Sequence, residues 1–274
     1  RDSTVFDFNH IGLSKFNVAL KDFNTENDDF LLNISELSLL EESGFYINNF
    51  DSKLLISSNE IRLDSTFIST PNSSISTSVL ALNFDHIRDL NDFINKVDIK
   101  SEINTSTIGL KDVSFFDSKF GDDNENLQLK GKISGEISKL KIDDLFIAFS
   151  DDSYINSNAL VTGLPDIESA VFEFSIEEGK TSKTDIDNIN FTSYGLASDV
   201  VLPAVLDKFG SIDLNGSFKG SYVDFESSFH VSSEVGLFDG SFNAIKKTDE
   251  YNYDGEIDVL GLNLRTLVND NDFN

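Results

Sequence analysis

Three histidines, His10, His86 and His230, are the side chains of this 274-residue sequence that could act as bases near neutral pH or bind a transition metal. They lie far apart in the sequence and share no motif, which is typical of histidines with packing or surface roles. The chain has no Cys, so thiol nucleophiles, disulfides and zinc–thiolate sites are excluded. We therefore expect no catalytic or metal site and no cofactor, and we predict that the protein is not an enzyme.

Serine is abundant, but no Gly-x-Ser-x-Gly nucleophile elbow occurs. The nearest segment, Gly131-Lys-Ile-Ser-Gly135, has its serine one place too late. Carboxylates are so numerous that no glycosidase pair can be singled out, and the absence of Trp counts against a sugar-binding cleft. These residues therefore predict no hydrolase.

Two acidic segments, Asp122-Asp-Asn-Glu-Asn126 and Asp185-Ile-Asp-Asn188, offer the hard oxygen ligands that calcium prefers. Neither matches the Asp-x-Asp/Asn-x-Asp/Asn-Gly loop of an EF-hand. We interpret both as solvated loop tips, since acidic tips also keep sheet edges from pairing with other chains.

Two glycine pairs, Gly131 with Gly135 and Gly216 with Gly220, could suggest a phosphate-binding loop. Each pair lies inside a predicted strand and no Gly-Lys-Ser/Thr follows it, so a nucleotide site is not expected. We predict instead that these glycines permit bulges or local bending, which a sheet needs in order to curl.

The chain carries 21 Lys and Arg against 48 Asp and Glu, a formal net charge of −27. Such a charge repels nucleic acid and anionic membrane surfaces, so no nucleic-acid partner is expected. At 39% hydrophobic residues the chain can bury a core, and it contains no run of about 18 apolar residues that would predict a membrane-spanning helix. Because it lacks Met and begins Arg1-Asp2-Ser3, we interpret it as an internal fragment of a longer exported protein.

The elements that must position these residues are predicted to be β-strands, because apolar and polar residues alternate over long stretches. In residues 127–137 every odd position is apolar or glycine and every even position is polar, which predicts a strand with one wet face. The same alternation predicts strands at 172–176, 212–220 and 225–231. Turn-forming clusters at 24–29, 121–126, 150–153 and 246–250 separate such segments and favour antiparallel hairpins.

Two short helices are predicted between the blocks of strands. From Asp85, a candidate N-cap, apolar residues recur at helical spacing between Ile87 and Val97, over about three turns. A second helix, roughly 202–209, has Pro203 near its start and Gly210 placed to end it.

Residues 127–135 and 212–220 share the pattern Φ-x-Φ-x-Gly-x-Φ-x-Gly, in which Φ is apolar. We expect one continuous segment over residues 1–274, with weak internal repeats around 99–192 and 211–264. Such repeats favour a stacked or elongated architecture, but alternation alone does not distinguish it from a compact β-sandwich.

Several segments resemble the repeating unit of the TamB and AsmA-like translocation and assembly family. The unit is carried by residues 129–145, with Gly131 and Gly135 spaced among aliphatics, and by Asn158–Asp166, a strand that ends in a Gly-Leu-Pro-Asp corner. Residues 108–116, read as a short inserted helical turn, and residues 63–75, a strand, a Thr-Pro turn and a strand, are also similar to that family. The likeness covers most of the chain.

This resemblance implies an all-β fold: an elongated, curled antiparallel sheet, β-taco-like, that forms an open apolar groove with short interrupting helices. It further implies a periplasmic segment that binds phospholipids and conducts their acyl chains between inner and outer membranes, and that aids outer-membrane protein assembly. The parent protein would be anchored in the inner membrane by a segment not present here. An outer-membrane, BamA-like barrel would be a partner reached through regions outside this sequence.

The 25 Phe residues suit such a groove, because their rings give an apolar wall without hydrogen-bonding groups. Strand parity selects the residues expected to line it, which are Ile133, Ile137, Phe172, Phe174, Phe218, Phe225 and Phe229. If Phe218 faces lipid, Lys219 faces water, so Phe218→Asp should impair transport far more than Lys219→Asp. The alternative is a β-sandwich surface adhesin or scaffold, with the Phe side chains buried in its core and no lipid conduit.

Overall fold

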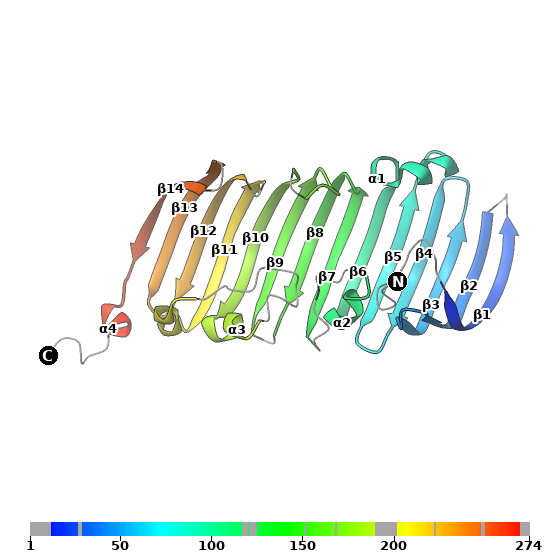
Figure 1. The fold of residues 1–274 in the computed structure, drawn as a ribbon, viewed down its shortest axis with the longest axis horizontal. Coiled ribbons are helices and arrows are strands. Elements are labelled where there is room, and N and C mark those ends of the chain that lie inside the picture. The colour runs from blue at the N-terminus through cyan, green and yellow to red at the C-terminus, as the bar shows by residue number, and fades with distance from the viewer. Residues whose placement is uncertain are drawn as a thin grey trace. The chain divides into compact units, whose positions relative to one another are not determined.

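The computed structural model describes residues 12–26, 29–116, 120, 125–150, 152–167, 169–189, 202–221, 223–247 and 250–268. These residues form fourteen antiparallel β-strands and a few short helices, so the predicted all-β class with short interrupting helices is confirmed (Figure 1). The chain divides into two compact units, of which one contains the described residues up to Ile137 and the other those from Ser138 onward.

The first unit is an open antiparallel sheet of seven strands in sequence order. They are β1 (Leu13–Glu26), β2 (Asp29–Glu41), β3 (Tyr46–Ile56), β4 (Glu60–Ser69), β5 (Ser74–Asn83), β6 (Asp98–Gly109) and β7 (Asn126–Glu136). A 3-10 helix, η1 (Ile87–Asp92), and α1 (Phe93–Lys96) connect β5 to β6, and α2 (Leu110–Val113) follows β6. Figure 1 shows α1 at one end of these strands and α2 at the other.

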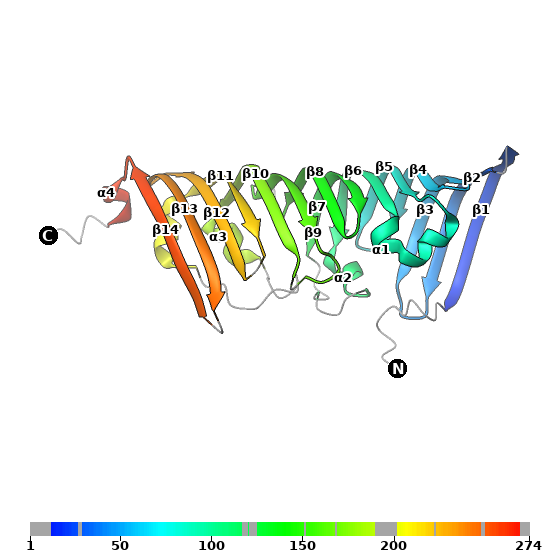
Figure 2. The same cartoon turned by 90° about the horizontal axis from the view of Figure 1, so that it is seen from above.

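The second unit repeats this plan with seven more strands. They are β8 (Lys139–Ala148), β9 (Tyr154–Thr162), β10 (Val171–Ser182), β11 (Ser211–Gly220), β12 (Asp224–Ser233), β13 (Gly236–Lys247) and β14 (Glu250–Leu260). Its helices are α3 (Lys183–Asn188), the 3-10 helix η3 (Ala204–Phe209) and α4 (Leu264–Leu267). The strands predicted from alternation are therefore β7, β10, β11 and β12, and in each unit neighbouring strands lie side by side in both views (Figures 1 and 2).

Several strands, among them β2, β4, β6, β8 and β10, carry a β-bulge, where the strand has an extra residue against its neighbour. The register with the next strand shifts, for example, between Asp51 and Lys53 along β3, between Ile103 and Ser106 along β6, and between Ile142 and Leu145 along β8. Bulges bend a strand and increase its twist, which gives each sheet its curl. Four of the extra residues have a left-handed backbone without being glycine, namely Asp22, Glu36, Ser65 and Asp144.

The bulges also invert the alternation of side chains. In β8, Leu140 and Ile142 precede the bulge and Leu145 follows it, yet all three pair with odd-numbered residues of β9 and so lie on one face. The extra residue is stabilised locally, because the backbone N–H of Asp144 donates to Oδ1 of Asn158 on the next strand (2.9 Å). Glu36 in the first unit donates in the same way to Oδ1 of Asp51 (2.9 Å).

Gly216 stands at a bulge of the neighbouring strand, as predicted, because the pairing of β10 with β11 shifts between Ile176, which is opposite Gly216, and Gly179, which is opposite Leu214. Gly220, at the end of β11, borders no register shift. The pairing of β11 with β12 runs from Asp213 to Gly220 without a register shift. At Gly216 the reason for glycine is space, since a Cβ there would lie 2.3 Å from the carbonyl oxygen of Ser228.

Both predicted helices occur at the expected residues, but their helix type differs from the prediction. The apolar run from Ile87 to Val97 is a 3-10 helix followed by one short α-helix, with His86 rather than Asp85 at the N-cap position. Its last apolar residue, Val97, is fully buried, so tertiary packing outweighs a regular helical stripe. The second predicted helix is η3, which Gly210 ends with a positive φ of 63°.

The large fully buried side chains lie at the ends of the strands, whereas small buried ones such as Ala244 of β13 lie within them. The largest are Leu110 in α2, Val97 after α1 and Val235 in the turn between β12 and β13. In the second unit, Phe209 of η3 stacks on Phe238 of β13 at a centroid distance of 5.3 Å. The short helices therefore cover strand ends and leave the middle of each sheet face to be lined by the strands themselves.

Candidate apolar binding face

In the second unit, one face of the sheet carries a continuous set of aromatic rings. Phe174 of β10 lies directly opposite Phe218 of β11, with ring centroids 6.2 Å apart. The contact continues from Phe218 to Phe225 of β12 (5.0 Å) and from Phe225 to Phe242 of β13 (5.9 Å). Phe172 stacks beside Phe174 at 5.9 Å. Rings from four successive strands thus form one apolar strip.

Phe229 lies on the same face between two glycines of the neighbouring strands. It is paired with Gly216 on one side and with Gly240 on the other. A Cβ atom added to Gly240 would lie 2.4 Å from Cζ of Phe229, so the ring lies over this glycine. Glycine opposite phenylalanine therefore gives the ring room to lie flat along the sheet.

In the first unit the corresponding face is aliphatic. Leu32, Leu54, Leu63 and Leu80 stand opposite one another on β2, β3, β4 and β5. The adjacent row contains Phe30, Ile56, Ile61, Leu82 and Ile99, from β2 to β6. Directly opposed side chains on neighbouring strands touch, so each row is an apolar ladder across the sheet.

The seven residues predicted to line a groove fall into both units. Five of them, Phe172, Phe174, Phe218, Phe225 and Phe229, share one face of the second unit. Phe174 pairs directly with Phe218, Phe172 and Phe225 both pair with Gly220, and Phe229 pairs with Gly216, two residues from Phe218. Ile133 belongs to the apolar face of the first unit, opposite Ser101, while Ile137 lies in the turn after β7, outside any strand.

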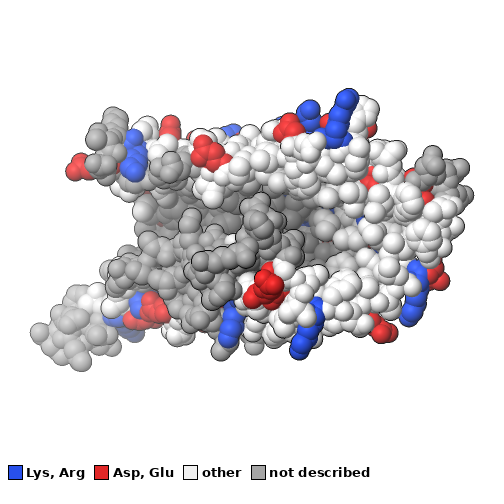
Figure 3. Space-filling model, turned by 45° about the vertical axis from the view of Figure 1, so that its right-hand side comes forward, with Lys and Arg blue, Asp and Glu red and all other residues white. Residues whose placement is uncertain are grey.

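No second sheet packs on these faces among the residues that the structure describes. In each unit every strand belongs to a single layer, and its strand neighbours are those next to it in sequence. The Phe rings of the strip are accordingly half-buried. On the side drawn in Figure 3, the charged side chains lie mainly at the outer rims, and the described surface between them is mostly uncharged. The described residues of neither unit therefore form the core of a two-sheet sandwich.

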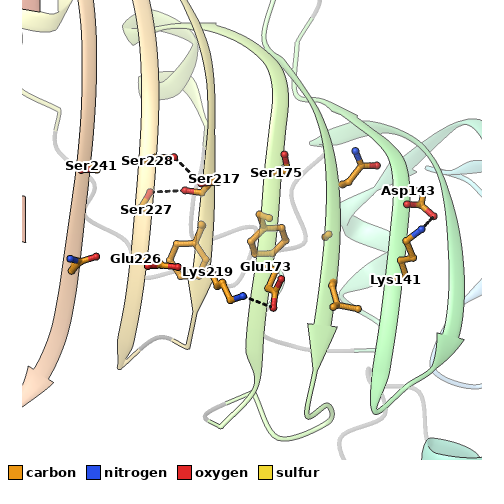
Figure 4. A pocket seen from close by; sticks show the side chains of 16 residues that line it. Lys141, Asp143, Glu173, Ser175, Ser217, Lys219, Glu226, Ser227, Ser228 and Ser241 are labelled. Atoms are coloured by element: carbon orange, nitrogen blue, oxygen red, sulfur yellow. Dashed lines mark hydrogen bonds and ion pairs between the residues drawn. The ribbon is translucent and has the colours of Figure 1, made fainter. Parts of the chain in front are cut away.

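The opposite face of the second unit is polar and slightly hollowed. Ser175, Ser217, Ser228 and Ser241 form a row across β10 to β13, beside a second row of Glu173, Lys219 and Glu226. These rows border a hollow of about 680 Å³ (Figure 4). The hydroxyls of Ser217 and Ser228 are 2.8 Å apart, and Lys219 lies 3.3 Å from Glu173. Phe174 and Phe218 also line the hollow, so hydroxyls, an ion pair and apolar side chains border it rather than a reactive group.

The histidines do not form a catalytic group with a described serine. His230 lies on the polar face of β12 with Nδ1 2.5 Å from Oδ1 of Asp239 on β13, a pair set by hairpin register that sequence spacing did not reveal. His86 is at the N-cap of η1, and His10 lies outside the described residues.

Resolved pKa shifts move groups away from neutral pH. The Tyr154 hydroxyl donates to Glu178 (2.8 Å), and this hydrogen bond raises the pKa of Tyr154. The hydrogen bond from Lys183 to Asp187, with further contribution from Asp207, raises the pKa of Lys183. Neither group is thereby tuned for general acid or base catalysis.

The acidic segment at Asp185–Asn188 is not a loop tip, so that interpretation was wrong. It lies in α3, where Asp185 accepts hydrogen bonds from the hydroxyls of Ser182 (2.9 Å) and Ser153 (2.8 Å). Of the other segment, Asp122–Asn126, residues 122–124 lie outside the described residues. The described part of the chain contains no group of three or more His, Asp or Glu side chains placed to hold a metal ion.

Sequence reasoning also missed a buried carboxylate at the end of the first sheet. Asp112 of α2 accepts hydrogen bonds from the hydroxyls of Thr70 and Ser73 and from Nδ2 of Asn72 (2.8 Å), all in the turn between β4 and β5. These partners are about forty positions away in sequence, so no local sequence pattern predicts the hydrogen bonds. The cluster attaches α2 to that turn and has a structural role.

None of the described helices has the length and apolar character needed to cross a membrane. Comparison of the chain with protein-family models, with curated proteins and with solved structures gives no match.

Proposed function

We propose that this chain is a lipid-binding segment whose apolar sheet faces hold and conduct phospholipid acyl chains. One observation carries the proposal. In each unit a single-layered sheet has one face of continuous apolar ladders that no second layer of described residues covers. A large apolar face that no described layer covers suits the binding of something apolar.

The chemistry of the strip from Phe174 to Phe242 suits alkyl chains. Burial of each methylene contributes about 0.8 kcal/mol, and aromatic rings offer a smooth wall without donors or acceptors. The serine that lies among the rings, Ser227, satisfies its hydroxyl by donating to the carbonyl oxygen of Ser217 (3.0 Å). The strip therefore presents no unsatisfied hydroxyl at that position to an acyl chain.

The charge of the chain supports recognition of tails rather than head groups. With a net charge of −27, the protein as a whole repels lipid phosphates rather than attracting them. Head groups would stay in water while the tails lie on the apolar face. Transport would follow if tails can move from ladder to ladder along the sheet.

The TamB and AsmA-like family, the periplasmic location and the inner-membrane anchor of a longer parent protein belong to this proposal. They rest on the glycine and aliphatic spacing of residues 129–145 and on the strand and corner at Asn158–Asp166. A role in outer-membrane protein assembly, with a BamA-like barrel as partner, rests on the same resemblance. A surface adhesin or scaffold without a lipid conduit is the alternative that the following experiment separates from it.

The test places a photoreactive phenylalanine analogue at Phe218 in one variant and at Ser217 in another, in the full chain mixed with phospholipid vesicles. Ser217 is the better control than Lys219, because replacing Lys219 would also break its ion pair with Glu173. Irradiation followed by mass spectrometry should show phospholipid attached at position 218 and not at position 217. Attachment at neither position would favour the adhesin or scaffold.

A further inference from the structure

Three hydroxyl side chains interrupt the aliphatic face of the first unit near its middle. They are Ser52 of β3, Thr66 of β4 and Thr77 of β5. Ser52 lies two residues from Leu54 and therefore on the same face, its hydroxyl is 2.9 Å from that of Thr66, and Thr66 stands directly opposite Thr77. The three residues, only 4%, 3% and 9% exposed, form one short row across neighbouring strands.

This row lies between two apolar ladders on the same three strands. The ladder on one side consists of Leu54, Leu63 and Leu80, and the ladder on the other side consists of Phe50, Ile68 and Ile75. An acyl chain that lies along the strands therefore crosses apolar side chains, then the hydroxyls, then apolar side chains again. A ligand group that bonds to the hydroxyls must carry alkyl segments on both sides.

One of the three hydroxyls lacks a hydrogen bond. Ser52 and Thr66 are bonded to each other, whereas Oγ1 of Thr77 is buried and finds no partner among the described residues. A buried hydroxyl without a partner destabilises a protein, and a valine would fill the same space without that cost. A threonine at this position is explained if a ligand supplies the missing partner.

We propose that Ser52, Thr66 and Thr77 form a notch that binds a hydroxyl group carried in the middle of an acyl chain. The inference rests on the proposed function, since it names the kind of chain that the apolar face of the first unit prefers. A ligand hydroxyl can accept a hydrogen bond from Thr77 and donate one to the oxygen of Thr66. A carbonyl oxygen only accepts, and the ester carbonyl of a phospholipid lies beside its head group rather than between two alkyl segments.

The experiment measures the affinity of the full chain for octadecanoic acid and for its mid-chain hydroxy derivative, by displacement of a fluorescent fatty acid. The hydroxy acid should bind about tenfold more tightly, because only the notch gives its hydroxyl hydrogen-bond partners within the apolar face. Equal affinity for the two acids would overturn the inference while leaving lipid binding intact. Binding of neither acid would overturn both the proposed function and this inference.

Three variants locate the preference. Thr77→Val removes the hydroxyl without changing the shape, so it should abolish the preference and keep the affinity for octadecanoic acid. Thr77→Ser keeps the hydroxyl and should keep the preference. The matched control is Thr107→Val in β6, which pairs with Gln128 on the opposite face and should also keep it. A preference that persists in Thr77→Val, or that Thr107→Val loses equally, would contradict a role for the notch.

Discussion

The ring of Phe229 lies over Gly240, so close that a Cβ on this glycine would come within 2.4 Å of the ring. The Gly240→Ala variant should therefore displace the ring and lower the free energy of unfolding by about 1–3 kcal/mol. In a Phe229→Ala background the same change should cost much less, because the ring is gone. Urea unfolding of the two single variants and the double variant measures this coupling.

The control for that cycle is Ser241→Ala, one residue further along β13 on the polar face. It should change stability by less than about 0.5 kcal/mol. If Gly240→Ala costs the same with and without the Phe229 ring, the ring does not occupy the space above the glycine.

Asp144 has a left-handed backbone, with φ of 52°, at the bulge of β8. Asp144→Gly should stabilise the protein by up to about 1 kcal/mol, because glycine adopts this conformation without steric cost. Asp213→Gly on β11, where the backbone is extended, should instead destabilise by about 0.5–1 kcal/mol. Thermal unfolding of both variants measures whether the first raises and the second lowers the stability. A loss of stability in both would argue against a strained backbone at the bulge.

Asp112 is buried beneath the turn between β4 and β5 and accepts hydrogen bonds from Thr70, Ser73 and Asn72. Asp112→Ala leaves these donors without their acceptor and should cost about 1–3 kcal/mol. Hydrogen exchange should accelerate in that turn and in α2. The neighbouring exposed change, Lys111→Ala, should leave exchange there unaltered, and an equal effect of the two variants would refute the role given to the carboxylate.

A charge placed in the aromatic strip should abolish lipid handling. Phe218→Asp puts a carboxylate among the rings of Phe174 and Phe225, and it should slow phospholipid transfer between vesicles by about tenfold or more. The matched control is Ser217→Asp on the polar face. Lys219→Asp is less suitable, because it would place a third acid beside Glu173 and Glu226. Equal transfer rates of the Phe218→Asp and Ser217→Asp variants would show that phospholipid transfer does not use the aromatic strip.

Alternation was sufficient to predict the shared face of Phe218, Phe225 and Phe229. It worked there because β11 and β12 pair without a bulge, so the period of two is unbroken. Alternation could not predict which face of the sheet a side chain occupies beyond a bulge. In β8, for example, two polar residues separate Ile142 from Leu145, and both apolar side chains lie on the same face. That doubled polar spacing, repeated at Ile176-Glu-Glu-Gly179, is a signal that sequence reading could have used.

Other features depend on contacts that no local pattern records. The pairing of His230 with Asp239 follows from the register of one hairpin, and the bonds to Asp112 join segments about forty residues apart. The form of the helix between Ile87 and Lys96 was mispredicted because packing of its end, at Val97, determines it more than propensity does.

The most direct test of the central claim uses the absence of Trp from the chain. A single Trp is introduced at Phe218 in one variant and at Ser217 in another, and each is mixed with phospholipid whose acyl chains carry bromine, a contact quencher of Trp fluorescence. If the aromatic strip binds acyl chains, fluorescence should be quenched in the Phe218→Trp variant and unchanged in the Ser217→Trp variant. Equal quenching at both positions, or none at either, would contradict an apolar face that holds lipid tails.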